Sequence, residues 1–560
     1  MVRGSRRPRT EGWQDAFRFQ SAAQGAALIY NRALSVVSSG GNAGEVLHRV
    51  EAQLARIGKQ HGIRRMVRAA AAMAGVTASL ALIAGCGNTY RPVVSAIAVV
   101  GPAAQPAKYA IAVSSPTQIP ANGPITFVGS WSSTTAYAIN QGVSYLGLQY
   151  VSLQNANVGH NPATSAAYWS LLANGSLTMV DFSGDTILVT APLGLNPYFL
   201  TLDSTGHTAF TLNSDRTLTS WPITTAYIPG TVLQSTLLAG ANPASLYATS
   251  SVTYIADPGV SAIDQLLGQP PALKQELPVA SGYMPVYVLG QSTSQRIYAI
   301  GAATGGGPGQ VEAIDNPNSS STSPTISATL AVGRGPVFGV MTGDTRRAFV
   351  LNQIDGTVSV INAQTNALDT PISTIPVGTR PVWADLAAGL DELVVANQGT
   401  GTSNGSVTIV NIPLCTATSL PVNPNCDPAN PVDATTFGQV VANIPVGPSP
   451  IMVSVLSDYT RAYVANQGNL SLPCGTGAAG SGTTLCSVSV VNLTTNTVTA
   501  TIPINGHPAW IATTDANPMG KVYVVCNDSQ VMTVIETDTD TVDTTIPLQG
   551  YGVSVRVTAP

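Results

Sequence analysis

Residues 375–381 read IPVGTRP, and they are followed by LVVANQG at 393–399 and GSVTIVN at 405–411. The first segment ends in a proline, the second ends its apolar run with an asparagine, and the third alternates apolar and polar residues. Such alternation is typical of strands that bury one face. Proline suits the first residue of a strand, which needs no N–H for the ladder, and asparagine closes turns with its side chain. These stretches therefore predict consecutive strands joined by turns.

The same order of segments recurs along the chain. IPVGPSP (444–450) precedes AYVANQG (462–468), and other clear copies begin at residues 332 and 502. Weaker copies extend the pattern backward and give eight anchor prolines, at positions 92, 197, 243, 285, 336, 381, 450 and 508. Self-similar units of about 45 residues, each with four strands, predict an all-β fold, a β-propeller of seven or eight four-stranded blades. The tail 552–557 is expected to add an inner strand that closes the ring.

One copy contains Tyr463-Val464-Ala465-Asn466, and other copies depart from it at the third position, with Leu351 and Val525. Over residues 332–550 these segments resemble the YVTN family of β-propeller repeats. The resemblance implies a protein of the cell envelope, because the family includes surface-layer and other envelope proteins. It also implies seven blades, whereas the anchor prolines favour eight units.

The charges are concentrated near the N-terminus. Residues 1–68 hold 12 of the 24 Lys and Arg residues and 4 of the 28 acids, which leaves the rest of the chain with a net charge of −12. Charged residues make up 9% of the chain. A sparse, acidic surface does not track phosphates, so we expect no nucleic-acid partner.

A secretory signal follows the basic segment. Arg64 and Arg65 flank Met66, and residues 69–85 carry no charge before Cys86. Basic, then apolar, then small residues is the order of such a signal. Residues 83–86 (Ile-Ala-Gly-Cys) resemble the bacterial lipobox, which implies lipidation of Cys86 and attachment to the membrane through that lipid.

We therefore interpret residues 66–85 as a lipoprotein signal and residues 1–65 as a misassigned extension or a leader. A weak membrane anchor or an uncleaved signal is the alternative. The expected location is the outer membrane or the cell surface, with the periplasmic face as the other option.

The remaining cysteines are expected to serve structure. Cys415 and Cys426 lie in one loop-like insertion and Cys474 and Cys486 in another, so each pair is expected to form a local disulfide in an oxidising compartment. Cys526 falls on a strand and is expected to be a buried thiol. Because no CxxC spacing or His partner accompanies them, we expect no metal site.

Residues 128–171 interrupt the first repeat, between its start at 86–127 and the remainder of the propeller at 172–560. This insertion holds six aromatic residues in 44 positions: Trp131, Tyr137, Tyr145, Tyr150, Tyr168 and Trp169. The order W…Y…V-x-Y-x-G-x-x-Y…G-x-x-P-x-x-S-x-x-Y-W resembles the small chitin-binding-type carbohydrate-binding modules.

The resemblance implies a platform of rings that stack on sugars. Its expected members are Tyr137, Tyr150, Tyr168 and Trp169, while Trp131, Tyr145 and Gly147 are assigned to the core and a turn. The alternative is a structural or adhesive insertion, because a domain of this size needs large side chains simply to build a core.

Few residues suggest catalysis. His207 and His507 fall in different repeats, and His507 is interpreted as a variable turn residue. The acidic run at residues 536–543 is interpreted as a solvated outer strand, with a Ca²⁺ site as the alternative. Arg334 and Arg380 occupy equivalent turns, where they either line a central funnel or simply repeat a turn residue.

The sequence therefore predicts a non-catalytic binding or scaffold platform with no catalytic residues, no cofactor and no metal. The expected partners are the membrane, through Cys86, and a polysaccharide or an envelope protein, with the protein itself monomeric. The alternative is a propeller enzyme of the lactonase-like hydrolase type. We expect an enzyme to gather His or acids at the mouth of the channel, and a scaffold to line the channel with small and polar residues.

Overall fold

The computed structural model describes residues 109–116 and 125–558. Shorter gaps within that range fall at 224–231, 292–293, 295, 316, 318–322, 371, 402, 414–435, 479 and 515–519. The predictions for residues 1–65, the signal at 66–85, Cys86, Cys415 and Cys426 lie outside the described residues. The described residues contain no helix with the length and hydropathy of a membrane span.

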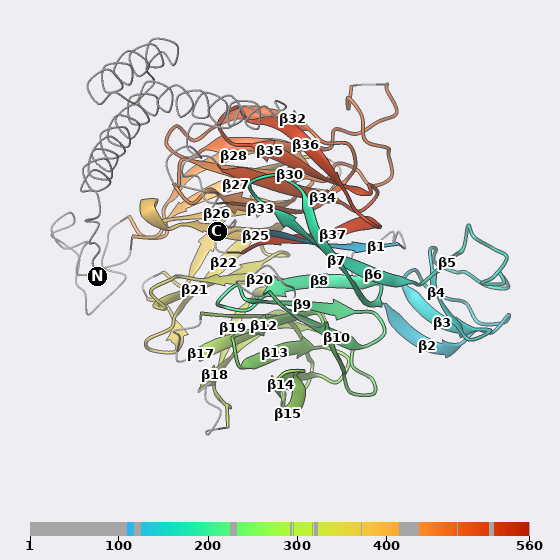
Figure 1. Cartoon of the computed structure of the whole chain (residues 1–560). Helices are drawn as coiled ribbons and strands as arrows, with labels where there is room; N and C mark the ends of the chain where they lie inside the picture. The colour runs from blue at the N-terminus through green and yellow to red at the C-terminus, as the bar shows by residue number, and fades with distance from the viewer. Residues whose placement is uncertain are drawn as a thin grey trace, which may run out of the picture. The chain divides into compact units, whose positions relative to one another are not determined.

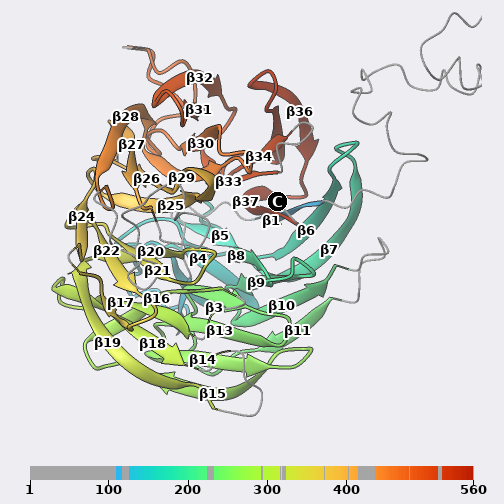
Figure 2. The ribbon, with the colours of Figure 1, turned by 90° about the vertical axis from the view of Figure 1, so that its left-hand side faces the viewer.

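Eight of the nine sheets formed by the described residues are the blades of a propeller, which confirms the predicted all-β class. Figure 1 shows the strands, and Figure 2 shows the sheets arranged around a common centre. From the inner strand outward, blade 1 contains β37 (Tyr551–Val557), β1 (Tyr109–Ser115), β6 (Asn174–Asp181) and β7 (Ile187–Leu195). Blade 2 contains β8 (Pro197–Leu202), β9 (Thr208–Asn213), β10 (Thr217–Pro222) and β11 (Leu233–Thr236). Blade 3 contains β12 (Ser245–Ala248), β13 (Val252–Asp257), β14 (Ala262–Leu267) and β15 (Ala272–Pro278). Blade 4 contains β16 (Tyr283–Gly290), β17 (Arg296–Ala303), β18 (Pro308–Asp315) and β19 (Thr325–Arg334).

The second half of the ring repeats this pattern. Blade 5 contains β20 (Pro336–Met341), β21 (Arg347–Asn352), β22 (Thr357–Asn362) and an outer strand split into β23 (Ala367–Leu368) and β24 (Thr374–Pro376). Blade 6 contains β25 (Pro381–Ala387), β26 (Glu392–Asn397), β27 (Asn404–Asn411) and β28 (Val440–Pro448), with a short 3-10 turn at Ala388–Leu390. Blade 7 contains β29 (Pro450–Val455), β30 (Arg461–Asn466), β31 (Ser487–Asn492) and β32 (Thr497–Pro503). Blade 8 contains β33 (Pro508–Thr513), β34 (Lys521–Cys526), β35 (Val531–Glu536) and β36 (Thr541–Pro547).

The ring closes by pairing the two ends of the described chain. Strand β37 is antiparallel to β1, with Val557 opposite Ala110 and Tyr551 opposite Ser115. The predicted closing strand is thus confirmed, and it also settles the blade count at eight. Pro92, which the sequence analysis took as the first anchor, lies outside the described residues; the inner strand of blade 1 comes from the C-terminal end instead. Closure matters because it leaves no exposed sheet edge at the junction.

A proline, an asparagine and a glycine together hold each repeated corner. Pro381 opens β25 and stands opposite Asn397, the last residue of β26. The Asn397 Nδ2 donates to Thr408 Oγ1 at 2.9 Å on the third strand. A Cβ at Gly378 would lie 2.6 Å from the Asn397 side chain, so this position has room for hydrogen only. The corner recurs at Pro197, Pro336 and Pro450, with Asn213, Asn352 and Asn466 as the partners.

Blade 8 departs from that corner. The residue opposite Pro508 is Cys526, so the register places Cys526 where blades 2, 5, 6 and 7 carry asparagine. The order of residues in the repeat predicts Asn527 at this place, which is wrong by one residue. Cys526 is a free, buried thiol, as expected. A thiol suits the site because it behaves as a small apolar side chain and leaves no amide unpaired.

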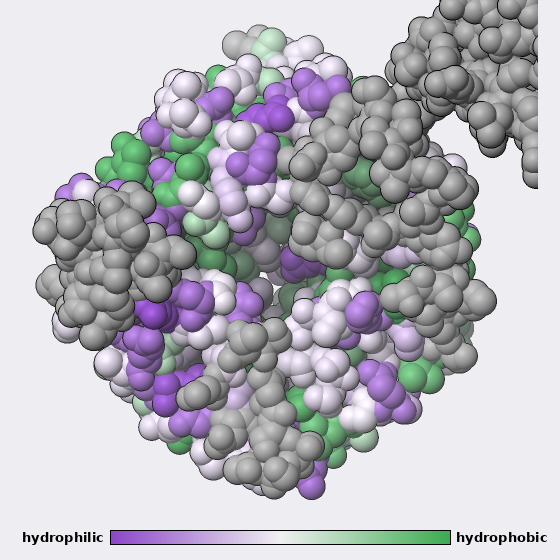
Figure 3. Space-filling model, turned by 60° about the vertical axis from the view of Figure 1, so that its left-hand side comes forward, coloured by the Kyte–Doolittle hydropathy of each residue, from purple (hydrophilic) through white to green (hydrophobic). Residues whose placement is uncertain are grey.

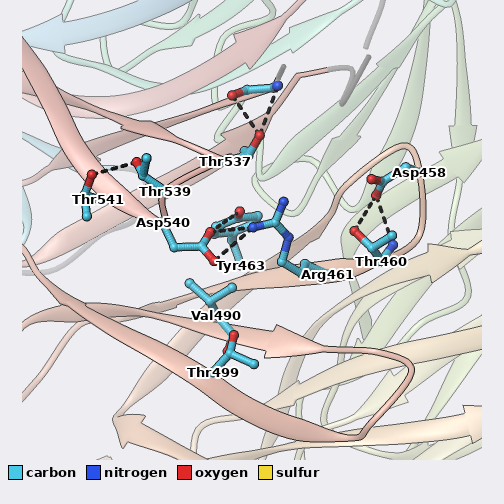
Figure 4. Close-up of polar contacts among 11 residues, drawn as sticks. Asp458, Thr460, Arg461, Tyr463, Val490, Thr499, Thr537, Thr539, Asp540 and Thr541 are labelled. Atoms are coloured by element: carbon cyan, nitrogen blue, oxygen red, sulfur yellow. Dashed lines mark hydrogen bonds and ion pairs between the residues drawn. The ribbon is translucent and has the colours of Figure 1, made fainter. Parts of the chain in front are cut away.

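The blades pack through apolar faces and through ion pairs between neighbours. All six residues of β21 are buried, whereas β32 alternates between exposed and covered positions. Figure 4 shows Asp540, in the turn after β35, accepting from Arg461 Nη1 at 2.9 Å and from Tyr463 Oη at 2.6 Å, both on blade 7. Asp540 has a φ of 52°, which turns its carboxylate toward that blade. At this residue the acidic run at 536–543 therefore serves as an inter-blade clamp, which corrects the interpretation of a purely solvated strand.

The insertion forms the ninth sheet, between β1 and β6 of blade 1, as predicted. Its strands are β2 (Thr126–Ser130), β3 (Gln141–Tyr145), β4 (Leu148–Ser152) and β5 (Trp169–Leu171). Strands β2 and β3 run parallel, and the other neighbours are antiparallel. The sheet buries a small cluster of its own around Val143.

Candidate functional site

The inner strands enclose a central cavity of about 490 Å³. Figure 3 shows the molecule hollowed near the centre of the ring. All eight blades contribute to the lining, from Thr201 on β8 of blade 2 to Arg556 on β37 of blade 1. A cavity of this volume is within the range of ligand pockets. Because most of its wall is built from the inner strands, the propeller itself positions most of its side chains.

A row of aromatic rings runs along this wall. Tyr287 and Phe338 have centroids 4.8 Å apart, Phe338 stacks on Trp383 at 3.9 Å, and Trp383 meets Trp510 edge-on at 5.1 Å. The Arg556 guanidinium carbon lies 4.5 Å from the Trp510 centroid. We call these five residues the channel row. Each of the four aromatic residues stands two positions after an anchor proline, so the repeat itself delivers the rings to one level of the channel.

Asp385 supplies the acid of the cavity. Its Oδ2 accepts from the backbone N–H of Val455 at 2.8 Å, and its Oδ1 accepts from that of Leu386 at 2.9 Å. Burial raises the pKa of Asp385 to about 6, although these two N–H groups and the charge of Arg556 act to lower it. The carboxylate is therefore ionised at neutral pH and takes up a proton in mildly acidic conditions.

Arg556 balances that acid across the cavity. Its Nε donates to the carbonyl of Leu200 at 3.3 Å, which fixes one side of the guanidinium. Burial lowers the pKa of Arg556, while Tyr287 and Asp385 act in the opposite direction. Arginine has such a high pKa that Arg556 stays protonated despite this lowering. Its guanidinium N–H groups can therefore donate to an acceptor on a ligand in the cavity.

This lining fits neither of the two patterns anticipated from the sequence. Among the described lining residues Asp385 is the one acid and no histidine occurs, so the clustered His or acids expected of an enzyme are missing there. The wall is also not simply small and polar, because the channel row occupies its centre. The recurrent aromatic position was visible in the sequence, two residues after each proline, but only the ring geometry shows that the four side chains meet.

Most of the sugar platform predicted for the insertion is wrong, because three of its four residues are buried. Tyr137 and Trp169 are each 2% exposed and Tyr150 is 7% exposed, so they form the core of the sheet and offer no free ring face. The Trp169 Nε1 donates to the His160 carbonyl at 2.8 Å. Four short strands need large side chains to build any core, and these three residues fill that role. Of the predicted platform, Tyr168 remains half-buried and stacks on His160 with centroids 3.3 Å apart.

The two rings assigned to the core, Trp131 and Tyr145, pack against it as expected but remain partly exposed. Trp131 and Tyr145 are half-buried, with centroids 5.2 Å apart in an edge-on contact. The Asn161 Nδ2 donates to Tyr145 Oη at 2.7 Å. Leu146, beside them, is 80% exposed. Together with Tyr168, these residues form the aromatic surface of the insertion that a ligand can touch.

The remaining predicted residues fall elsewhere. Cys474 and Cys486 are joined in a disulfide. His507 lies in the turn before β33, with its Nδ1 2.9 Å from Cys474 Sγ and 3.1 Å from Cys486 Sγ. Arg334 pairs with Asp355, its Nε 2.7 Å from Oδ1, and is half exposed away from the cavity lining.

Comparisons with known proteins show no family for this chain. No protein-family model matches the chain, and no curated protein matches it. The dihydro-heme d1 dehydrogenase NirN is similar in structure, with a TM-score of 0.49 and 12% identity over 68% of this chain and 72% of that chain. Apo AztD from Citrobacter koseri has a TM-score of 0.42 and 11% identity, covering 68% of this chain and 94% of that chain. A 6-phosphogluconolactonase candidate from Bacteroides fragilis has a TM-score of 0.43 and 13% identity, covering 81% of this chain and 99% of that chain.

The fold and the cavity thus define a β-propeller with a strand-built central pocket.

Proposed function

We propose that the chain is a non-catalytic binding protein of the cell envelope, anchored by lipid on Cys86, whose central cavity holds a small ring-bearing ligand. The observation that carries the proposal is the channel row, in which four rings and a guanidinium lie in consecutive contact along the central cavity. The export signal and the likeness of the repeats to YVTN segments support the envelope location.

The chemistry of the row defines the class of ligand. Aromatic rings stack on planar or ring-shaped apolar faces, and each such pair contributes about 0.5–1.5 kcal/mol beyond the buried area. Arg556 offers donors to a carboxylate, phosphate or hydroxyl oxygen. The pocket therefore suits a ligand that combines one ring face with one acceptor group, such as an aromatic acid or a sugar acid.

The insertion adds a second contact with a polysaccharide. Its residue order resembles chitin-binding-type modules, and Trp131, Tyr145 and Tyr168 present the reachable ring surface. Partly exposed rings of this kind stack on sugars while polar tips hold hydroxyls. Under this proposal the insertion attaches the propeller to an envelope or environmental glycan, while the cavity binds a soluble compound.

Intrinsic fluorescence tests the cavity, because Trp383 lines it and Trp510 packs edge-on against Trp383. A panel of aromatic acids and sugar acids is titrated into the mature protein, and a true ligand quenches the tryptophan signal with saturation. Arg556→Gln should lower the affinity by more than about tenfold, since a charged hydrogen bond contributes about 1.5–3 kcal/mol. Trp221, buried in another blade, is the matched control, and Trp221→Phe should leave the titration unchanged. Saturable binding that Arg556→Gln leaves intact would place the ligand elsewhere.

A lactonase-like hydrolase is the second candidate, favoured by Asp385. An acid with a pKa of about 6 inside a pocket is suited to act as a general base. A panel of lactones distinguishes the two functions: turnover that Asp385→Asn reduces by about 100-fold or more would establish the hydrolase, and binding without turnover supports the platform.

A further inference from the structure

Two cysteines and a histidine meet between blades 7 and 8. Cys474 lies in the loop after β30, Cys486 directly precedes β31, and His507 directly precedes β33. The two Sγ atoms and the His507 Nδ1 all lie within 4.8 Å of one another. We call these three residues the thiol–imidazole cluster. No part of the proposed ligand binding uses it.

The backbone holds the histidine in this orientation. The His507 N–H donates to Asp528 Oδ1 at 2.6 Å, and the His507 carbonyl accepts from the N–H of Asn527 at 3.0 Å. Gly506 has a φ of 126°, and a Cβ there would lie 2.7 Å from Asp528 Oδ1. The turn is therefore built around a glycine that lets the chain approach Asp528 and directs the next side chain inward.

His507 and Cys486 shield one side of the cluster from water. His507 is 5% exposed and Cys486 is 1% exposed, whereas Cys474 remains partly accessible. Within the described part of the chain, both contacts of the His507 Nδ1 end on sulfur. Disulfide sulfurs are weak acceptors, so a buried imidazole gains little from facing them. The same nitrogen is a strong ligand for a metal that the two sulfurs would share once they are thiolates.

We propose that the reduced thiol–imidazole cluster is a zinc site, with Cys474 Sγ, Cys486 Sγ and His507 Nδ1 as ligands. The disulfide closes the site, because a bonded pair of sulfurs has no thiolate to offer. Reduction opens it: an external dithiol gives two electrons and two protons to the Cys474–Cys486 bond and becomes a disulfide itself, leaving two thiols. Zinc then displaces both thiol protons, and the His507 ring binds as neutral imidazole.

The donor set favours zinc. Two thiolates with one imidazole match the ligands that Zn²⁺ takes in proteins, and three protein ligands leave a fourth position open. The partly accessible side of Cys474 is where water or another small ligand reaches that position. In an oxidising compartment the disulfide is the resting form. The site therefore couples metal binding to the arrival of a dithiol reductant.

The test compares the oxidised and reduced mature chain in the background Cys415→Ser/Cys426→Ser, so that these two cysteines do not compete for the metal. The protein is reduced with a phosphine, desalted without oxygen and titrated with Zn²⁺ against a chromophoric chelator. Co²⁺ serves as a second probe, since thiolate ligation produces a charge-transfer band. We expect a single zinc ion per chain after reduction, none before it, and return of the metal to the chelator on reoxidation.

Variants distinguish the cluster from adventitious thiols. Removing an outer partner of a zinc ligand costs about 10–100-fold in affinity, so His507→Ala, which removes a ligand, should cost more than about 100-fold. Cys474→Ser, at the more accessible thiol, should abolish the cobalt band. Cys526→Ala removes the remaining free thiol outside the cluster and should bind zinc as the background does. Circular dichroism verifies that each variant is folded.

The possible outcomes are decisive. If the reduced background binds no zinc, the disulfide is purely structural and the proposal is overturned. It is equally overturned if binding survives in His507→Ala, or if the oxidised chain binds zinc as tightly as the reduced one.

Discussion

Blade 3 carries an acid pair where other blades carry an amide and a hydroxyl. Asp257 stands at the asparagine position of the repeat, and Asp264 stands at the third-strand position that Ser359 occupies in blade 5. Asp257 and Asp264 are 0% and 1% exposed. Asp257 Oδ2 and Asp264 Oδ1 find no hydrogen-bond donor among the described residues. We therefore predict that Asp264→Asn stabilises the protein in a manner that depends on pH.

The direction follows from the pKa values. Burial raises the pKa of Asp264 from 3.8 to about 7, and the charges of Asp257 and Glu276 add to the rise. The folded protein then holds a proton that the unfolded chain has released, so stability falls as the pH rises from about 4 to about 7. Asparagine has no charge to lose. The variant should lack this fall in stability between about pH 4 and pH 7, so its gain over the wild type should be larger at pH 8 than at pH 5.

The magnitude has a ceiling of about 4 kcal/mol, from a shift of about 3 units at about 1.36 kcal/mol each. Relaxation around a buried charge reduces this, and about 2 kcal/mol is the expected gain at pH 8. With an unfolding entropy of about 2.1 cal/mol/K per residue over about 450 residues, that gain raises the Tm by about 2 °C.

Scanning calorimetry at pH 5 and pH 8, at equal ionic strength, measures the effect. Asp538→Asn is the matched control, because that acid is exposed in a turn and its loss should not alter the Tm. An equal Tm shift for Asp264→Asn at both pH values would refute the buried-charge reasoning, and so would a lower Tm at pH 8.

Three further predictions concern the anchor, the repeat corner and the insertion. Cys86→Ala should move the protein from the detergent phase to the aqueous phase on Triton X-114 partitioning, and unchanged partitioning would exclude a lipid at that residue. Gly378→Ala should cost about 1–3 kcal/mol in urea unfolding, because its Cβ meets the Asn397 side chain; Gly343→Ala, with nothing within 4 Å, is the control and should be near neutral. Trp131→Ala should abolish retention on a chitin column while leaving circular dichroism unchanged, whereas Trp169→Ala should unfold the insertion, a loss of about 3–5 kcal/mol; retention that survives Trp131→Ala would remove that ring from the glycan contact.

The propeller ring could be predicted from the sequence because each repeat carries the residues that form its own corner. Each corner has three local requirements: a proline where the ladder needs no N–H, an asparagine that faces a hydroxyl on the next strand, and a glycine where a Cβ would meet that asparagine. They can be found without knowing how the blades assemble. The closing strand was also predictable, since residues 552–557 alternate as an inner strand should and would otherwise lack a partner.

The insertion and the cluster were not predictable in the same way. Spacing shows that Trp131 and Trp169 share a module, but burial depends on which face of a four-stranded sheet meets its small core. Tyr145 and Tyr150 lie five residues apart, on paired strands β3 and β4, and only the structure shows that one is reachable and the other buried. His507 and Cys486 are 21 residues apart, in different blades, so no local spacing rule joins them.

The positions that depart from the repeat carry residues that the folding of a blade does not require. A blade folds with asparagine facing serine or threonine, yet blade 3 buries two acids there and blade 8 buries a thiol. The inner strand of blade 1 has no anchor proline and brings Arg556 to the rings instead. Since burying an acid or a guanidinium lowers stability relative to the polar pair that the repeat uses, we expect each departure to have a compensating role. The roles proposed for the channel row, the acid pair and the thiol–imidazole cluster can therefore be tested separately. At each of them, substitution by the residues that the other blades carry should raise the stability and remove the proposed property.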